Sequence, residues 1–138
     1  MTGGARATIG SGAVVLIVDD EPDMCWALGH VLKESGIVSV TATSGQEALL
    51  LARQQRFNLA FIDAKLPDAE WRGLARLIRE ANPGIPIVLV SGYFYDDDPE
   101  VLQASTEGVI NGFLSKPFLH EEVRTITRST LALRLEDL

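Results

Sequence analysis

Polar residues that could do chemistry follow four apolar runs of this sequence. Asp19 and Asp20 come directly after VVLIV, Asp63 follows NLAFI, Ser91 follows IVLV, and Lys116 follows VINGFLS. If these runs are parallel strands, their carboxyl ends meet at one edge of a sheet, where open α/β sheets bind ligands. Carboxylates, a hydroxyl and an ammonium would then share one crevice, a combination suited to a cation and a phosphate group.

The carboxylates indicate a hard divalent cation. Asp19, Asp20 and Asp63 would repel one another if all were ionised in one pocket, unless a cation lay between them. Mg²⁺ fits best because it prefers oxygen ligands, keeps several waters and is typically held by one or two carboxylates and a phosphate oxygen. His30 and His120 lack the spacing of a zinc site, so we expect them on helix surfaces.

A carboxylate at a strand end, a lysine, a hydroxyl and Mg²⁺ fit phosphoryl transfer onto an aspartate. Lys116 would pair with phosphoryl oxygens as a point charge, and Ser91 would donate a hydrogen bond to one of them. The alternative is that each aspartate merely ends a strand or caps a helix. That explains any single position, but it explains poorly why each polar residue closes a separate strand in matching order.

Composition limits the kinds of protein that carry this pattern. The chain has 138 residues, 46% apolar and 22% charged, which fits one ordinary globular domain. Its net charge of −7 argues against contact with a nucleic-acid backbone or an anionic membrane. The single cysteine, Cys25, excludes an internal disulfide, and neither a signal peptide nor an apolar stretch of transmembrane length is apparent. We therefore expect a cytoplasmic setting.

From Val14 onward, short β-branched runs alternate with amphipathic stretches, which predicts βαβ units. Strands are expected over 14–19, 37–42, 58–63, 86–91 and 110–115, the second being polar enough for a sheet edge. Helices are expected over Pro22–Ser35, after a Ser44–Glu47 capping box, over Glu70–Ala81, after an Asp97 or Asp98 cap, and from Leu119 to about Leu133. The Gly-rich first thirteen residues are expected to form a flexible leader without function.

With these motifs the chain resembles the receiver domains of two-component response regulators. The matching segments are VVLIVDDEPD, FNLAFIDAKLPD, IPIVLVSGY and GFLSKPF, within about residues 13–134, and their spacing is near that of the family. The resemblance implies a flavodoxin-like (βα)5 fold over residues 14–134, doubly wound, with parallel strand order 2-1-3-4-5 and helices on both faces.

The resemblance also implies a role for each polar residue of the crevice. Asp63 would be the phosphoacceptor and Lys116 the phosphate-binding lysine. Asp20 and Asp63 would bind Mg²⁺ directly, together with the backbone carbonyl of Lys65. Asp19 would act on the same ion through a water molecule.

The resemblance further implies a switch. Ser91 would move toward the phosphoryl group, and Phe113, at the family's aromatic position, would turn inward to fill the vacated space. The alternative is that Phe113 is simply a core aromatic of a strand. Pro117 is expected to follow a cis peptide bond that aims Lys116, because proline makes the cis form accessible.

Two segments depart from the family pattern. In PDAEWRGL, Gly73 comes late and Trp71 is inserted, either as a core anchor, which we favour, or as a contact for a partner. The segment GYFYDDDPE lengthens the connection after Ser91 with aromatic and acidic residues.

Lys65 and Tyr93 occupy positions that in this family tune hydrolysis of the aspartyl phosphate, and a cationic side chain there predicts slow phosphate loss.

Partners follow from the resemblance alone. A histidine kinase or phosphotransfer protein would dock near the first helix, where Met24 and Cys25 could be partly exposed. The alternative for Cys25 is that it is buried. An output domain or partner would use the fourth helix, fifth strand and fifth helix, with homodimerisation on phosphorylation as one outcome.

The chain ends in LRLEDL, so we expect the receiver of a longer transcriptional or signalling regulator, with 135–138 as its end or the start of a linker. The alternatives are a stand-alone regulator, a receiver that binds partners without phosphorylation, and a Mg²⁺-dependent phosphatase. Lys65 stands where a phosphatase would place a second acid, which argues against that enzyme class. We expect no enzyme activity beyond phosphorylation and dephosphorylation of Asp63 itself.

Overall fold

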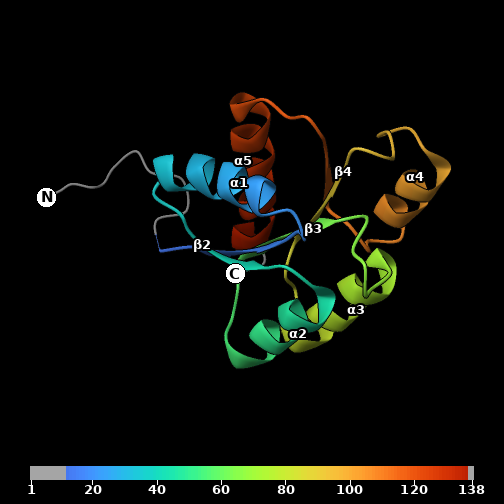
Figure 1. Ribbon diagram of the computed structural model, residues 1–138, viewed down its shortest axis with the longest axis horizontal. Coiled ribbons are helices and arrows are strands. Elements are labelled where there is room, and N and C mark those ends of the chain that lie inside the picture. Colours follow the sequence, from blue (N-terminus) through green and yellow to red (C-terminus); the bar gives the residue numbers. More distant parts are fainter. Residues whose placement is uncertain (1–11, 137–138) are drawn as a thin grey trace, which may run out of the picture.

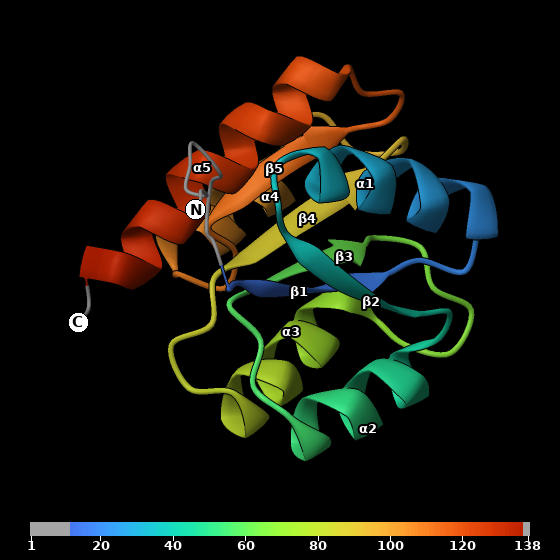
Figure 2. The same cartoon turned by 90° about the vertical axis from the view of Figure 1, so that its left-hand side faces the viewer.

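The structure, a computed structural model, describes residues 12–136 and consists of one parallel sheet covered by helices on both faces. The strand order is β2-β1-β3-β4-β5. Helices α1 and α5 cover one face, and α2, α3 and α4 cover the other (Figures 1 and 2). This confirms the predicted doubly wound fold and its strand order.

The bounds of the elements lie close to those expected. The strands are β1 (Val14–Val18), β2 (Val38–Ala42), β3 (Leu59–Asp63), β4 (Ile87–Ser91) and β5 (Gly112–Ser115). The helices are α1 (Pro22–Glu34), α2 (Gly45–Gln54), α3 (Trp71–Ala81), α4 (Pro99–Thr106) and α5 (His120–Glu136).

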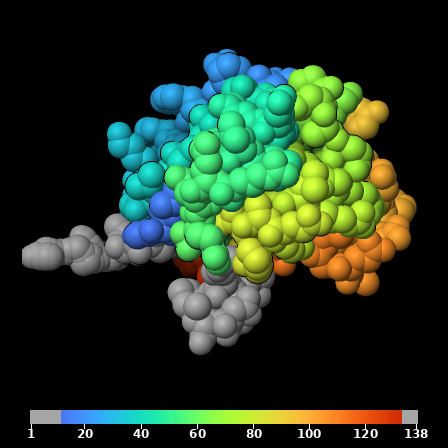
Figure 3. All heavy atoms as spheres, turned by 90° about the horizontal axis from the view of Figure 1, so that it is seen from below, coloured from blue at the N-terminus to red at the C-terminus, as the bar shows by residue number. Residues whose placement is uncertain are grey.

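Continuous apolar strands build two cores, one on each face of the sheet. Side chains alternate between faces along a strand, so Val15 and Ile17 pack under α1 and α5, whereas Leu16 and Val18 pack under α2 and α3. Every residue of β3 and β4 is buried, while β2 lies at the sheet edge and has only one buried residue. Figure 3 shows α2 and α3 side by side on one face of the molecule.

The helix starts match the sequence signals at some positions and differ at others. Ser44 Oγ accepts a hydrogen bond from the Glu47 N–H at 3.1 Å, and the Glu47 carboxylate accepts one from the N–H of Thr43, the residue before the cap. Asp98 occupies the N-cap of α4, as expected, but its side chain makes no capping hydrogen bond. Its carboxylate instead accepts from the Tyr95 N–H at 2.6 Å and closes the preceding loop.

The start of β5 and the end of α5 differ from expectation. β5 begins at Gly112 rather than residue 110, because the side chain of Asn111 takes up the N–H of Ile87 at 2.9 Å where a longer strand would continue. Helix α5 continues to Glu136, beyond the expected Leu133, so residues 135 and 136 are helical.

Ala13, placed in the expected leader, is buried and accepts a hydrogen bond from the Val38 N–H. Residues 1–11 of that leader lie outside the described residues. Within residues 12–136, none of the helices combines the length and the apolar character needed to cross a bilayer.

Candidate functional site

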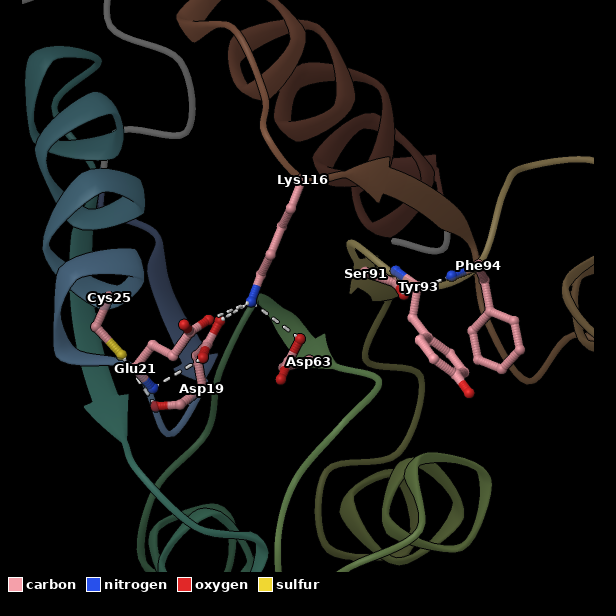
Figure 4. Close-up of polar contacts among 8 residues, drawn as sticks. All are labelled: Asp19, Glu21, Cys25, Asp63, Ser91, Tyr93, Phe94 and Lys116. Carbon is pink, nitrogen blue, oxygen red and sulfur yellow. Dashed lines mark hydrogen bonds and ion pairs between the residues drawn. The ribbon is translucent and has the colours of Figure 1, made fainter.

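The strand ends bring the predicted polar residues to one edge of the sheet. Asp19 follows β1, Asp63 and Ser91 are the last residues of β3 and β4, and Lys116 follows β5 (Figure 4). A cavity of about 340 Å³ opens there and is lined by Asp20, Glu21, Asp63, Lys65, Ser91, Gly92, Tyr93 and Lys116. The parallel order of the strands therefore produces the convergence that the sequence predicts.

Lys116 is the centre of the charge network. Its Nζ lies 2.8 Å from Asp19 Oδ2, 3.1 Å from Asp63 Oδ1 and 3.1 Å from Glu21 Oε1. The Asp19 and Asp63 side chains are buried, whereas Glu21 is 65% exposed. Burial by itself would lower the pKa of Lys116, but the hydrogen bonds and charges of Asp19 and Asp63 outweigh it and raise that pKa above its usual range. The lysine is therefore a fixed cation.

Asp63 lies in surroundings that disfavour its negative charge. Burial, and next the charge of Asp19, raise the pKa of the Asp63 carboxyl above its ordinary value. Contacts with Lys116 and with the backbone N–H of Lys65 act in the opposite direction but do not cancel the increase. Lys116 therefore offsets only part of the cost of holding the Asp63 carboxylate charged in a buried site beside Asp19, and a bound cation would offset more of it.

The donor set fits a hard divalent cation. Carboxylate oxygens of Asp19, Asp20 and Asp63 lie within 4.8 Å of one another, and the side chains described, those of residues 12–132, form no second such cluster of acid, histidine or cysteine ligands. Asp19 Oδ2 is buried, and its one polar contact among the described residues is the ion pair with Lys116 Nζ at 2.8 Å. A buried carboxylate oxygen with a single partner, beside two other acids, fits the oxygen ligands that Mg²⁺ prefers. Lys65, the fourth predicted ligand, lies at the same cavity, with its Nζ 4.5 Å from the centre of the Tyr93 ring.

Of the two predicted switch residues, Ser91 lines this cavity, whereas Phe113 lies on the neighbouring strand β5 and is not part of the lining. Ser91 is buried, and its Oγ accepts hydrogen bonds from the N–H groups of Tyr93 and Phe94, both at 2.9 Å. Phe113 is half-buried on β5 and packs against the core under α3 and α4. The peptide bond between Lys116 and Pro117 is cis.

Other residues singled out in the sequence lie away from the cavity. His30 and His120 are exposed and face one another at 6.2 Å between α1 and α5, as expected for surface histidines. Cys25 is buried, and burial, followed by the charge of Asp19, raises the pKa of its thiol to about 11, so it is not a reactive thiol. Met24 is half-buried. Trp71 is 5% exposed, which confirms the core-anchor interpretation.

Two residues of the site were missed in the sequence. Glu21 contacts Lys116, and its position directly after two aspartates was the signal that could have identified it. Phe94 packs edge-on against Trp71, with ring centroids 6.3 Å apart. No pattern in the sequence connects these two aromatic residues.

Comparison with known proteins gives concordant matches. A family model described as "Response regulator receiver domain" matches residues 15–128. The probable transcriptional regulatory protein TcrX of Mycobacterium tuberculosis is 32% identical over 91% of this chain and 53% of its own length. The nitrogen assimilation regulatory protein NtrX of Azorhizobium caulinodans is 33% identical over 88% of this chain and 27% of its own. The chain thus spans about half or less of these relatives.

Solved structures give the same result. A CheY-like response regulator receiver domain protein from Methanospirillum hungatei JF-1 superposes with a TM-score of 0.82 at 25% identity, covering 91% of this chain and 98% of that one. The chemotaxis protein CheY4 of Vibrio cholerae superposes with a TM-score of 0.77 at 27% identity, covering 86% of this chain and 98% of that one.

Proposed function

Because this chain belongs to the response regulator receiver domain family, we propose that it is a phosphorylation-activated switch in which Asp63 accepts the phosphoryl group. The observation that carries the proposal is the position of the Asp63 carboxylate. It closes β3, lies 3.1 Å from Lys116 Nζ and shares its cavity with Ser91. The nucleophile, the cation that would balance the phosphoryl group and the hydroxyl donor thus meet at one point.

In the proposed reaction, a carboxylate oxygen of Asp63 attacks the phosphorus of the donor. A bond forms between that oxygen and phosphorus, while the bond from phosphorus to the donor breaks and its electron pair leaves with the donor. Lys116 shifts from Asp19 and Glu21 to a phosphoryl oxygen, and Ser91 donates its O–H to another. No separate base is needed, because an ionised carboxylate has no proton to lose.

Mg²⁺ is the proposed cofactor. Asp19, Asp20, Asp63 and the backbone carbonyl of Lys65 are the groups that would hold it. When bound, it would neutralise negative charge on the phosphoryl oxygens. The support is the cluster of three carboxylates, together with the raised pKa of Asp63, to which burial contributes most and the charge of Asp19 next.

The proposed phosphoryl donor is a histidine kinase or phosphotransfer protein, and the proposed output surface consists of α4, β5 and α5. A groove of about 380 Å³ on that surface is lined by Phe113, Ile126 and Glu122, among others, and offers apolar and acidic contacts. An output domain, a separate partner or a second phosphorylated copy are the candidate occupants. Because the named relatives are longer regulatory proteins, we propose the receiver of a longer regulator ahead of a stand-alone one.

Acetyl phosphate and Mg²⁺, followed by intact-mass measurement, test the proposal. We expect one phosphoryl adduct on the parent protein and none on Asp63→Asn. Asp97→Asn, which alters an exposed carboxylate of the loop before α4, is the matched control and should keep the adduct. No adduct on any variant would indicate a receiver that works without phosphorylation. Sustained release of inorganic phosphate without an adduct would instead indicate a phosphatase.

A further inference from the structure

The loop between β4 and α4 fixes the backbone at Phe94 through the hydroxyl of Ser91. Ser91 Oγ accepts from the N–H groups of Tyr93 and Phe94, each at 2.9 Å (Figure 4). Both bonds lead into the loop and neither reaches Asp63. The position of the Ser91 hydroxyl therefore restrains the position of the Phe94 backbone.

The Phe94 ring in turn contacts the start of α3. It meets the Trp71 ring edge-on, with centroids 6.3 Å apart and an interplanar angle of 70°. Trp71 is the first residue of α3 and is buried, and Phe94 packs on the same core cluster. A shift of Phe94 therefore changes the surroundings of Trp71, because packed aromatic rings leave little free space.

The start of α3 is tied to α4 by Arg72. Its guanidinium lies 5.0 Å from the centre of the Trp71 ring, and its Nη2 donates to the backbone carbonyl of Glu100 at 3.0 Å. Its Nη1 also lies 3.9 Å from Glu107 at the other end of α4. Ser91, Phe94, Trp71 and Arg72 thus form one chain of contacts from the cavity to α4.

We propose that Phe94 and Trp71 form a second aromatic relay, separate from Phe113, which transmits the state of Ser91 to α3 and α4. The inference rests on the proposed phosphorylation of Asp63. In this relay the Ser91 side chain moves toward the phosphoryl group on Asp63, and the movement of Oγ lengthens at least one of its two hydrogen bonds with the loop amides. Phe94 then shifts against Trp71, and the contacts of Arg72 with α4 shift with it.

The two segments that depart from the family's sequence pattern supply the two rings. Trp71 belongs to PDAEWRGL and Phe94 to GYFYDDDPE, and the two segments meet at this one aromatic contact. A ring in either segment alone would have no partner for this contact. The relay accounts for both departures with a single structural role.

The experiment uses Trp71 as the reporter. The sequence has two tryptophans, so Trp26→Phe, at a position 70% exposed on α1, leaves Trp71 as the only one. Emission is recorded with Mg²⁺ alone and then after acetyl phosphate, with intact mass measured on the same samples. We expect phosphorylation to shift Trp71 emission to longer wavelength and to increase its quenching by acrylamide, because withdrawal of Phe94 opens one edge of the ring to water.

Two further variants in this background locate the cause. Phe94→Leu should keep the phosphoryl adduct but lose the emission shift, whereas Tyr95→Leu, at a neighbouring position 72% exposed, should keep both. Phe94→Met replaces Phe94→Leu if circular dichroism shows that the latter does not fold. An unchanged emission in fully phosphorylated protein overturns the relay and leaves the phosphorylation intact, as does a full shift in Phe94→Leu. Absence of the adduct overturns the proposed function and the relay together.

Discussion

Replacing Lys116 with methionine should destabilise the protein by about 3 kcal/mol at neutral pH, because it leaves two buried carboxylates without their positively charged partner. Methionine keeps much of the apolar stem and removes the ammonium, which lies 2.8 Å from Asp19 and 3.1 Å from Asp63. Removing one partner of a buried ion pair costs about 3–5 kcal/mol. The contact with Glu21, whose side chain is 65% exposed, adds little, since surface pairs contribute about 0–1 kcal/mol. Protonation of Asp63 limits the loss, which favours the lower end of the range.

Urea unfolding followed by circular dichroism, without added metal, measures this loss. A double-mutant cycle with Asp63→Asn isolates its origin. In the Asp63→Asn background, Lys116→Met leaves only one buried carboxylate without a partner, so its cost should fall by about 1–3 kcal/mol. Mg²⁺ at about 100 times its dissociation constant should add about 2.7 kcal/mol to proteins that retain all three aspartates.

Lys33→Met, at an exposed position in the last turn of α1, is the control and should stay within about 0.5 kcal/mol of the parent. The reasoning fails if Lys116→Met costs the same in both Asp63 backgrounds to within about 0.5 kcal/mol, because the two positions would then be energetically independent. It also fails if saturating Mg²⁺ stabilises Asp63→Asn as much as it stabilises the parent.

Three further predictions concern pH, output and phosphate lifetime. The folded-state pKa of Asp63 is raised, so the folded metal-free protein holds this proton more tightly than the unfolded chain does. The resulting stabilisation is full below the unfolded pKa of about 4 and is lost as pH rises through the folded pKa; urea unfolding across this range should show the decline in the parent and not in Asp63→Asn. Phe113→Ala should weaken binding of a phosphorylation-dependent partner more than it slows adduct formation, and equal losses of both would contradict a switch role. Lys65→Ala, which removes the cation stacked on Tyr93 at the cavity, should speed loss of the phosphoryl group followed by intact mass. An unchanged lifetime would exclude shielding by Lys65.

The site was predictable because its residues lie at strand ends. Once VVLIV, NLAFI and IVLV are assigned to parallel strands, Asp19, Asp63 and Ser91 have to emerge at the same edge, whatever the details of the loops. The sheet order itself came from the family resemblance, because apolar runs alone do not state which strands are neighbours.

Details that depend on a choice between distant partners were not predictable. β5 begins only after Asn111, because the side chain of Asn111 accepts hydrogen bonds from Ile87 and Arg79, which come 24 and 32 residues earlier in the chain. The Asp98 side chain could accept a hydrogen bond either from the first turn of α4 or from the Tyr95 N–H. Local sequence does not indicate which of these two hydrogen bonds forms. Side-chain hydrogen bonds thus determine where helices and strands begin and end, while hydrophobic burial determines which segments form them.

The position of Lys116 links the phosphoryl group to the cation. This lysine now neutralises Asp19, whose side chain is buried, and the same ammonium is the one proposed to bind a phosphoryl oxygen on Asp63. It cannot fully satisfy both, so when it shifts toward the phosphoryl group, Asp19 is left as a buried charge that needs another positive partner. Phosphorylation should therefore strengthen cation binding at Asp19 and Asp20, and by thermodynamic reciprocity the cation should stabilise the phosphorylated form by the same factor. Asp19→Asn removes the charge that has to be replaced, so it should reduce this coupling even where the phosphoryl adduct still forms, as Mg²⁺ titrations of stability with and without the adduct would show.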